Sequence, residues 1–387
     1  MSSPTQFDFA SLPDLRDMHS NEVVVQTMYL ECQVPLSFDH HTPKDGALMC
    51  NGMSVFVCAL RHLYSHMAIK WRGDPSVTED KLLEQIRGEE AENPVLRFAW
   101  SFFTPSRESL MAQNRMMGAL SSHLLEGDFG IADLSFLSLM ESPLMYKTLL
   151  QREPFQLYYP YPLSQPIREG VEEPDKEWDV DDGRRDVLGM AKCSLITWNG
   201  QGDLGDFITS KFGIKAAASL KMRYLWMSNK PAVIRVHYHA PASNPPRFYD
   251  LKNISIDGQR PRPIEGTRSA IMIDTREKGS LQYILVAAIR LRNGPKEKDT
   301  IRRYSTDGQE IPAPSDYPFA NPDWRVGDPG RQYMLFYTEM PKHSTGVRLG
   351  EVAWRPEGAE RNMRDTHDWV RRTVALNAAE GKKGGGS

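Results

Sequence analysis

The sequence predicts an α+β fold, with helices in the first part of the chain and strands in the second. Between residues 52 and 155 apolar side chains recur at helical spacing. After Leu188, runs rich in Val, Ile, Tyr and Phe alternate with turn residues. The chain has 387 residues with 40% apolar content, enough to bury a substantial core. Helices followed by strands favour a helical lobe packed on an antiparallel sheet over a wound parallel sheet.

The strongest helical pattern covers Gly52–Ile69, where large apolar residues such as Phe56 and Leu60 form one continuous face. Capping residues predict two further helices, one starting at Thr78 and ending at Ile86, the other covering Ser106–Leu125. Shorter helices are expected at Ile131–Met140 and Met145–Leu150. The sheet should contain strands at Cys193–Trp198, Met222–Met227, Ala232–Tyr238, Ala270–Ile273, Leu281–Leu291, Ile301–Ser305 and Gln332–Thr338.

Composition shifts divide the chain into four parts. Residues 1–45 are expected to be an irregular extension with one strand at Val23–Leu30. The main domain covers residues 46–340, and a helical extension and a flexible tail follow it. The acidic run EEPDKEWDVDD is typical of a solvated loop. The predicted subdivisions are a helical lobe at 46–155, an acidic loop at 160–187, a sheet lobe at 188–340, the extension at 341–380 and the tail at 381–387.

Charge and cysteine content narrow the class of protein. The net charge is −3, which argues against a general nucleic-acid or membrane partner. No apolar run reaches the roughly 18–20 residues of a membrane span. The four cysteines form no CxxC pair, so neither a zinc ribbon nor a disulfide framework is expected. We therefore expect a cytoplasmic or nuclear protein with reduced cysteines and no cofactor. The basic residues at Arg260–Arg268 and the pair Arg302–Arg303 are expected in exposed loops.

Three stretches resemble, in the same order, the ubiquitin-specific protease family. Leu48–His62 (LMCNGMSVFVCALRH) resembles the family's Cys box, and Lys230–His237 (KPAVIRVH) resembles its PPVLIIHLKRF strand. The third stretch, LQYILVAAIRLR…DTIRRYSTDG…YMLFYTE, resembles the strands that carry the family's general base. The resemblance spans Leu48 to Glu339. It implies a papain-like fold with a helical lobe, an antiparallel sheet lobe and shortened, zinc-free fingers.

The same resemblance places the catalytic positions on residues that cannot do the chemistry. Asn51 occupies the nucleophile position and Thr300 the position of the general base, and no histidine lies between Ala240 and Lys342. A thiol hydrolase needs a base to form its thiolate. Cys50 is a candidate thiol, but a shift of one residue turns a side chain by about 100° around a helix. No catalytic residue is therefore predicted, and the chain is expected to bind ubiquitin, a ubiquitin-like protein or another protein as a scaffold.

Two other functions stay open at this point. A rebuilt cysteine hydrolase would use Cys50 with a distant histidine such as His41 or His343. The chain could instead be an unrelated α+β assembly subunit, which would have no cleft between its helical and sheet lobes.

Two groups of side chains outside the protease motifs are candidates for binding. Phe155–Tyr161 is a dense aromatic stretch that would either close the core or contact a partner. From it we take Tyr158, Tyr159 and Tyr161, together with Tyr304, as candidate partner contacts. Cys58, His62 and His66 recur every four residues on the long helix. Paired histidines at that spacing can hold a metal, but packed side chains are the simpler interpretation, and no metal site is predicted.

Overall fold

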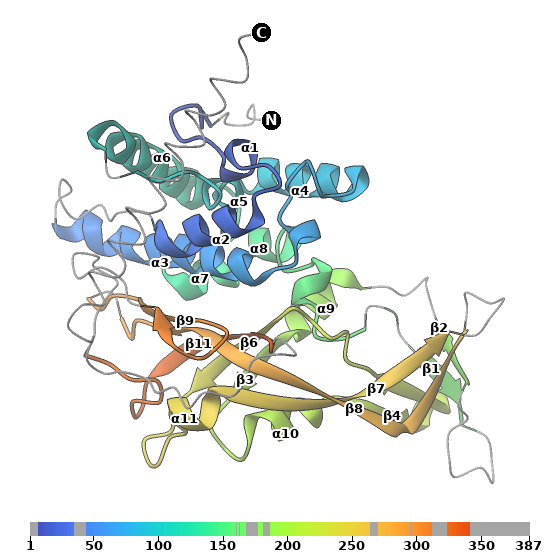
Figure 1. Cartoon of the computed structure of the whole chain (residues 1–387). Coiled ribbons are helices and arrows are strands. Elements are labelled where there is room, and N and C mark those ends of the chain that lie inside the picture. The colour runs from blue at the N-terminus through green and yellow to red at the C-terminus, as the bar shows by residue number, and fades with distance from the viewer. Residues whose placement is uncertain are drawn as a thin grey trace.

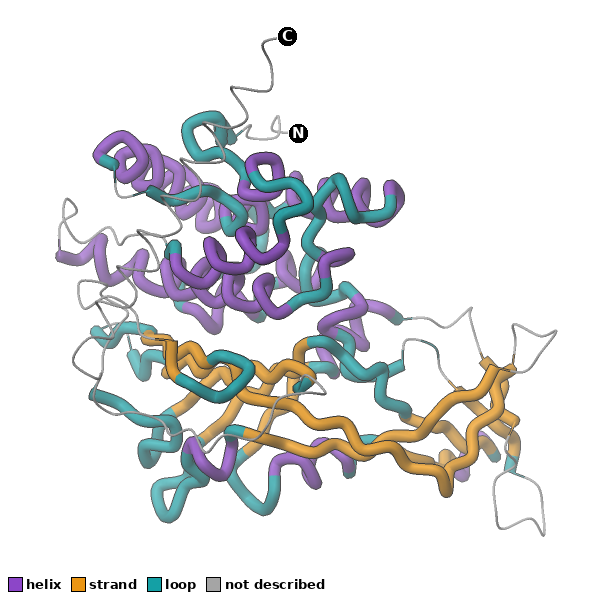
Figure 2. The backbone as a smooth tube through the Cα atoms, in the orientation of Figure 1, coloured by secondary structure: helices purple, strands orange, loops and turns teal. Residues whose placement is uncertain are grey.

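The computed structural model describes residues 7–34, 44–104, 106–159, 161, 163–167, 177–180, 186–263, 270–294, 296–311 and 323–340. Within these ranges, side chains at 44–50, 218, 259–263 and 270–278 are not described. The chain is α+β: a layer of helices covers one face of a sheet (Figure 1). Figure 2 shows the two kinds of structure largely separated in space.

Most helices belong to the first half of the chain. None in the described residues is long and apolar enough to cross a membrane. Their bounds are α1 Leu15–Met18, α2 Val23–Cys32, α3 Lys44–His66, α4 Asp80–Glu92, α5 Pro94–Phe98, α6 Arg107–Glu126, α7 Phe136–Met140, α8 Pro143–Lys147, α9 Val187–Cys193, α10 Leu204–Thr209 and α11 Phe248–Leu251.

The described strands form one sheet, ordered β3-β6-β11-β8-β2-β1-β5-β4 along its main path, with β7 and β9 also paired to β8 and β10 paired to β9. An entirely antiparallel sheet was predicted, but β3 runs parallel to β6. The strands are β1 Leu163–Pro166, β2 Glu177–Val180, β3 Leu195–Trp198, β4 Gly213–Ala217, β5 Met222–Trp226, β6 Val233–His239, β7 Asn253–Pro263, β8 Ala270–Arg290, β9 Thr300–Tyr304, β10 Glu310–Ile311 and β11 Gln332–Glu339.

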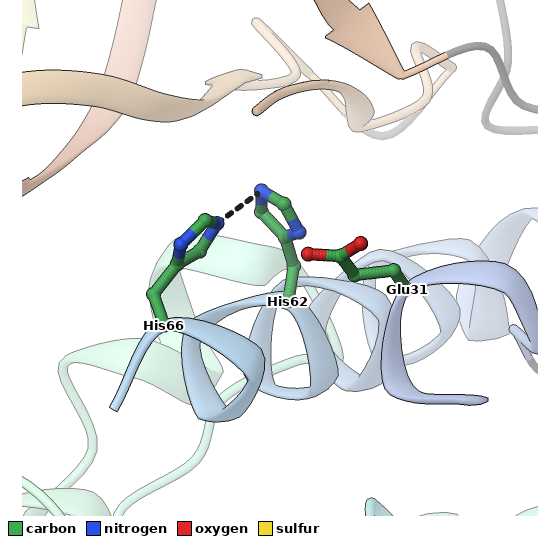
Figure 3. Close-up of side chains that lie close together, drawn as sticks. All are labelled: Glu31, His62 and His66. Carbon is green, nitrogen blue, oxygen red and sulfur yellow. Dashed lines mark hydrogen bonds between the residues drawn. The ribbon is translucent and has the colours of Figure 1, made fainter. Parts of the chain in front are cut away.

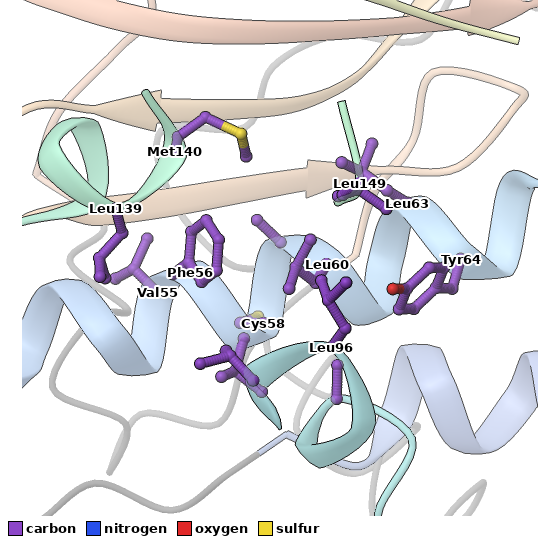
Figure 4. Packing of buried hydrophobic residues seen from close by; sticks show 14 of the residues in the cluster. Val55, Phe56, Cys58, Leu60, Leu63, Tyr64, Leu96, Leu139, Met140 and Leu149 are labelled. Atoms are coloured by element: carbon purple, nitrogen blue, oxygen red, sulfur yellow. The ribbon is translucent and has the colours of Figure 1, made fainter. Parts of the chain in front are cut away.

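Helix α3 is the centre of the helical layer. From Asn51 to Ser65 every residue is buried, and the helix contacts α2, α5 and α7 as well as β8 and β9. The apolar face predicted from its spacing, including Phe56 and Leu60, packs in the core (Figure 4). Polar side chains on a helix that is surrounded on all sides generally find hydrogen-bond partners inside the protein. This explains why Arg61 and His62 are bonded to backbone carbonyls.

Helix α2 replaces the strand predicted at Val23–Leu30, and it shows that the N-terminal extension is not irregular throughout. Val, Thr and Tyr favour strands locally, but here tertiary contacts decide. Gln26 and Tyr29 face the core, and the Gln26 amide donates to the His19 carbonyl and to Asp74. At the C-terminal end Arg61 donates to the carbonyl of Tyr29, which also accepts from the backbone N–H of Gln33.

Strand β8 is longer than predicted and joins the two strands expected at Ala270–Ile273 and Leu281–Leu291. It pairs with β2, β7, β9 and β11. Its register with β11 shifts between Phe336 and Tyr337: Phe336 pairs with Ala287 and Tyr337 with Leu285, so Val286 is bulged out of the ladder. A bulged residue has a carbonyl free for other partners.

The sequence predicted that the acidic segment at 160–187 is a loop, but the structure shows that part of it forms strands. It contains β1 and β2, which pair with each other. Trp178, in the middle of the acidic run, is fully buried with Leu163, Leu225 and Met227. The large area that an indole removes from water outweighs the cost of ordering a charged segment.

Helix boundaries differ from the predictions where capping decides. Ser106, predicted as the first residue of a helix, is instead the cap of α6, because its hydroxyl accepts from the backbone N–H of Ser109. The helix predicted from Ile131 begins only at Phe136, where Ser135 caps α7. The helical extension predicted at 341–380 lies outside the described residues.

Candidate functional site

The nucleophile position of the protease resemblance lies inside α3 rather than at its start. The helix begins at Lys44, so Cys50 and Asn51 come about two turns later. The free N–H groups that stabilise a thiolate occur only in the first turn of a helix. Asn51 is 4% exposed, and neither atom of its amide has a hydrogen-bond partner in the described structure. The side chain of Cys50 lies outside the described residues.

The surface of α3 next to Asn51 is closed by the chain that leads into α7. A Cβ built on Gly52 would lie 2.1 Å from the carbonyl oxygen of Leu134 and 2.7 Å from the Cα of Ser135. Only glycine permits the backbone at 134–136 to approach the helix this closely. No substrate chain can pass between Gly52 and this segment in the conformation observed.

Thr300, at the base position, is equally inaccessible. It begins β9 opposite Arg290, is 2% exposed, and its hydroxyl oxygen has no partner among the described atoms. The neighbouring Asp299 accepts from the backbone N–H of Phe136 and of Arg292, each at 3.0 Å. Burial raises the pKa of this carboxyl. Asp299 therefore ties the closing segment to the sheet.

The described cysteines do not supply an alternative nucleophile. Burial raises the pKa of the Cys58 and Cys32 thiols, which disfavours a thiolate. Cys193 is exposed at the end of α9. No hydrogen bond joins a thiol to an imidazole anywhere in the described part of the chain. The described residues therefore contain no thiol–imidazole pair, and the side chains of Cys50, His41 and His343, which the rebuilt hydrolase would use, lie outside them.

The aromatic candidates separate into core and surface residues. Tyr304 is completely buried, with its ring 4.8 Å from that of Phe248, so it cannot contact a partner as expected. Tyr158 is also buried and packs edge-on against Phe212 and Trp226.

Tyr159 and Tyr161 are half-buried, and their ring centroids lie 5.7 Å apart. They line a cavity of about 250 Å³ between α9 and strands β1 and β5. Its wall is largely apolar, with Asp186 as its charged residue, and also includes Leu163, Gly189, Met190, Cys193, Tyr224, Leu225, Trp226 and Met227.

Two of the three metal candidates meet at the other end of α3. His62 and His66 lie with their Nε2 atoms 3.3 Å apart, and Glu31 at the end of α2 completes a group whose ligand atoms are all within 4.8 Å (Figure 3). Cys58 is not part of this group. Glu31 was missed because it directly follows the strand predicted at Val23–Leu30, and nothing in the local sequence brings it near residue 62.

Burial favours the neutral form of the imidazoles of His62 and His66. It lowers the pKa of His62 well below the usual range, with contributions from His66 and Arg303. It also lowers the pKa of His66 to about 4, assisted by Arg72. For Glu31, burial raises the pKa, although Ser65, Arg303 and Arg72 act in the opposite direction.

The basic pair Arg302–Arg303 was predicted in an exposed loop, but it is not in one. Both side chains are buried in β9. Arg302 donates to the Trp324 carbonyl and pairs with Glu310 at 2.6 Å, while Arg303 donates to the Glu31 carbonyl. Both guanidinium groups therefore bond inside the protein, although Nη2 of Arg303 has no hydrogen-bond partner among the described atoms. The segment Arg260–Arg268 falls outside the described side chains.

Comparisons with known proteins give a weak structural likeness only. No protein family and no curated protein matches the sequence at a significant level. Among solved structures, the chain is similar to the Saccharomyces cerevisiae Pan2 pseudoubiquitin hydrolase–RNA exonuclease module. With AAUUAA RNA, that structure is 10% identical over 88% of this chain and 56% of that chain, with a TM-score of 0.23.

Two further structures of the same module give similar values. The complex with A7 RNA is 10% identical over 88% of this chain and 56% of that chain, with a TM-score of 0.26. The module without RNA is 11% identical over 90% and 60%, with a TM-score of 0.24. The chain thus spans less than two thirds of the length of these structures.

Proposed function

We propose that the chain is a catalytically inactive relative of the ubiquitin-specific proteases that acts by binding a protein partner. Ubiquitin or a ubiquitin-like protein is the first candidate for that partner. The observation that carries the proposal is the state of the two key positions: Asn51 is buried two turns inside α3, and Thr300 is buried at the start of β9.

The chain architecture agrees with this proposal. The motifs for the Cys box, the PPVLIIHLKRF-like strand and the final strands fall on α3, β6, β8, β9 and β11. In this proposal the helical layer and the near part of the sheet correspond to the two lobes of the protease fold. The distal strands β1, β2, β4 and β5, with the far halves of β7 and β8, would be its fingers.

The proposed contact with the partner is the cavity beside Tyr159 and Tyr161. Its volume of about 250 Å³ is enough for one or two apolar side chains. Aromatic side chains around a concave site are typical of protein-binding hot spots, because they bury a large area with little loss of conformational entropy. A partner that inserts an apolar side chain here would also lie on the fingers of the proposed fold.

A ubiquitin probe with a thiol-reactive C-terminus tests the loss of catalysis. We expect no covalent labelling of the full-length protein, and the same result for Cys50→Ala, under conditions that label an active ubiquitin-specific protease. Labelling of the wild type that disappears in Cys50→Ala would establish the rebuilt hydrolase instead.

Binding is tested separately by titrating the protein with ubiquitin and ubiquitin-like proteins. Tyr161→Ala should weaken binding by roughly tenfold, because truncated aromatic hot spots typically cost about 1–2 kcal/mol or more. Tyr249→Ala is the matched control, since Tyr249 is 64% exposed on α11, away from the cavity. The proposed surface would be contradicted if both variants lost affinity equally, or if neither variant lost affinity.

A further inference from the structure

We propose that Glu31, His62 and His66 form a binding site for a divalent transition-metal ion of the zinc class. The site would lie where the ends of α2 and α3 meet β8 and β9. This inference does not depend on the proposed function, because it concerns the opposite end of α3 from Asn51.

The three side chains are a suitable donor set. Two histidines four residues apart on one helix can present nitrogen atoms to a single ion, and two histidines with one glutamate are a known set of zinc ligands. Their ligand atoms lie within 4.8 Å of one another. Bonds of about 2.0–2.2 Å place tetrahedral ligands roughly 3.3 Å apart. His66 now faces the Nε2 edge of the His62 ring, with the two Nε2 atoms 3.3 Å apart, whereas Glu31 lies at the Nδ1 edge (Figure 3). Binding at Nδ1 of His62 would therefore require the partly buried His66 side chain to turn to the side of Glu31.

His62 is prepared as a ligand by its contacts with the sheet. Its Nε2 lies 2.9 Å from the carbonyl oxygen of Val286 and 3.1 Å from that of Tyr304, so Nε2 carries the proton and donates. The lone pair is then on Nδ1, which is buried and has no partner in the described structure. A ring N–H held by a backbone carbonyl is the usual support of a metal-binding histidine. The bulge at Val286 supplies one of these carbonyls.

Glu31 has an underused carboxylate. The Ser65 hydroxyl lies 3.1 Å from its Oε1 but also 2.7 Å from the carbonyl of His62, and it has one proton for the two acceptors. No ion pair holds this carboxylate within the described residues. In Figure 3 the carboxylate lies on the Nδ1 side of His62, where the free lone pair is.

Two nearby arginines oppose a cation, but neither is paired with the Glu31 carboxylate in the described structure. Arg72 donates to the carbonyls of Met67 and Ser65 and to the Thr27 hydroxyl. Arg303 donates to the backbone carbonyl of Glu31, not to its carboxylate. The carboxylate therefore stays available to an ion. We expect an affinity below that of structural zinc-finger sites, because both arginines raise the electrostatic cost.

The test uses the full-length protein, treated with a chelator and then titrated with Zn²⁺ by calorimetry and with Co²⁺ by visible absorption. We expect one ion per chain and the absorption bands of tetrahedral cobalt. Glu31→Gln and His66→Gln should each lower the Zn²⁺ affinity by about tenfold or more, since loss of even a supporting partner typically costs that much. Both residues are partly exposed, so the variants should fold, which circular dichroism verifies.

Two histidine variants serve as controls. His123→Gln removes a histidine on α6 that contacts Phe7 and Phe129. His239→Gln removes one member of a second pair of histidines, His237 and His239, whose ring centroids lie 4.3 Å apart. Both variants should bind Zn²⁺ like the wild type. Absence of binding by the wild type, unchanged affinity in Glu31→Gln and His66→Gln, or loss of binding in His239→Gln would each overturn the proposal.

Discussion

Arg61 connects three segments of the helical layer through its guanidinium group. It is completely buried and donates to the carbonyls of Gln33, Tyr29, Ala99 and Ser101 at 2.6–2.9 Å. Its Cζ also lies 4.8 Å from the centroid of the Phe103 ring. The planar group with several fixed donors suits this task, whereas the single ammonium of lysine does not.

Arg61→Ala should lower the free energy of unfolding by at least about 3 kcal/mol, since each buried carbonyl left without a donor costs roughly 1–3 kcal/mol. Urea titration measures the change. Arg115→Ala, at an exposed position on α6, should change stability by less than about 0.5 kcal/mol. A loss for Arg61→Ala no larger than that of the control would show that these bonds add no net stability.

Asp14 makes stability depend on acid pH. Burial opposes its ionisation, but the paired Arg16 and the nearby Arg97 outweigh burial and lower its pKa. Arg16 bonds this carboxylate at 2.7 Å and Glu90 at 2.7 Å. Because the folded pKa is below the ordinary value of about 3.9, this contribution is complete above about pH 4 and is lost as the pH falls through the folded pKa.

Asp14→Asn should therefore destabilise the protein at pH 7 by about 1.5–3 kcal/mol, the range for hydrogen bonds to charged groups. The difference from the wild type should begin to narrow below about pH 4, where the Asp14 carboxyl of the unfolded chain takes up a proton, and should narrow further as the pH falls through the lower pKa of the folded state. Unfolding free energies measured between pH 7 and pH 3 follow this change. Asp17→Asn, at an exposed position, should change stability at pH 7 by less than about 0.5 kcal/mol. A pH-independent difference for Asp14→Asn would contradict the assignment.

At the scale of elements, the contact between α3 and the segment before α7 requires Gly52. Gly52→Ala should destabilise the protein by about 1–3 kcal/mol or more, because the new methyl group would collide with backbone atoms of Leu134 and Ser135. Gly118→Ala in α6 is the matched control, since nothing lies within 4 Å of its added Cβ.

The Gly118 variant should be stabilised by about 0.5–1 kcal/mol through helix propensity. Thermal and urea unfolding of both variants measure the contrast. If Gly52→Ala were as stable as Gly118→Ala, the close approach of the two segments would be wrong.

Helix α2 shows how an element can contradict its local sequence. The run VVVQT favours a strand locally, yet its buried residues pack on α3 and its terminal carbonyls are bonded by Arg61 and Arg303. Both arginines are remote in sequence, so no window around residue 27 contains the information that decides the helix.

At the scale of the whole molecule, the helical layer and the sheet share a core. One cluster joins α3 residues such as Met53 and Leu60 to sheet residues such as Ile289 and Phe336. A second fills the other face of the sheet. The distal strands have a much smaller cluster, formed by Leu163, Trp178, Leu225 and Met227. Regions with little buried apolar area open most easily.

Amide hydrogens in β1 and β2 should therefore exchange faster than those in β6 and β11, as measured by mass spectrometry. Trp178→Ala should accelerate exchange further in β1 and β2, while β6 and β11 stay as protected as in the wild type. Equal protection of all four strands would show that the distal sheet opens only with the rest of the molecule.

Much of the secondary structure follows from local pattern. The apolar spacing of Gly52–Ile69 predicts the buried part of α3, which ends at His66. The Val-, Ile- and Tyr-rich runs predict β5, β6, β9 and β11 to within about two residues. The acidic segment was misjudged because its charges are visible in the sequence, whereas the cavity that receives Trp178 is made by residues far along the chain.

The sequence by itself determined the order of helices and strands and the absence of a thiol at position 51 and an imidazole at position 300, because these depend on residue identity and short-range spacing. The tertiary structure alone decided that α2 is a helix, that residues 134–136 close over Gly52, and that Glu31 lies beside His62. Each of these results from contacts between segments distant in the chain, whose free energy exceeds the local preferences of the residues involved.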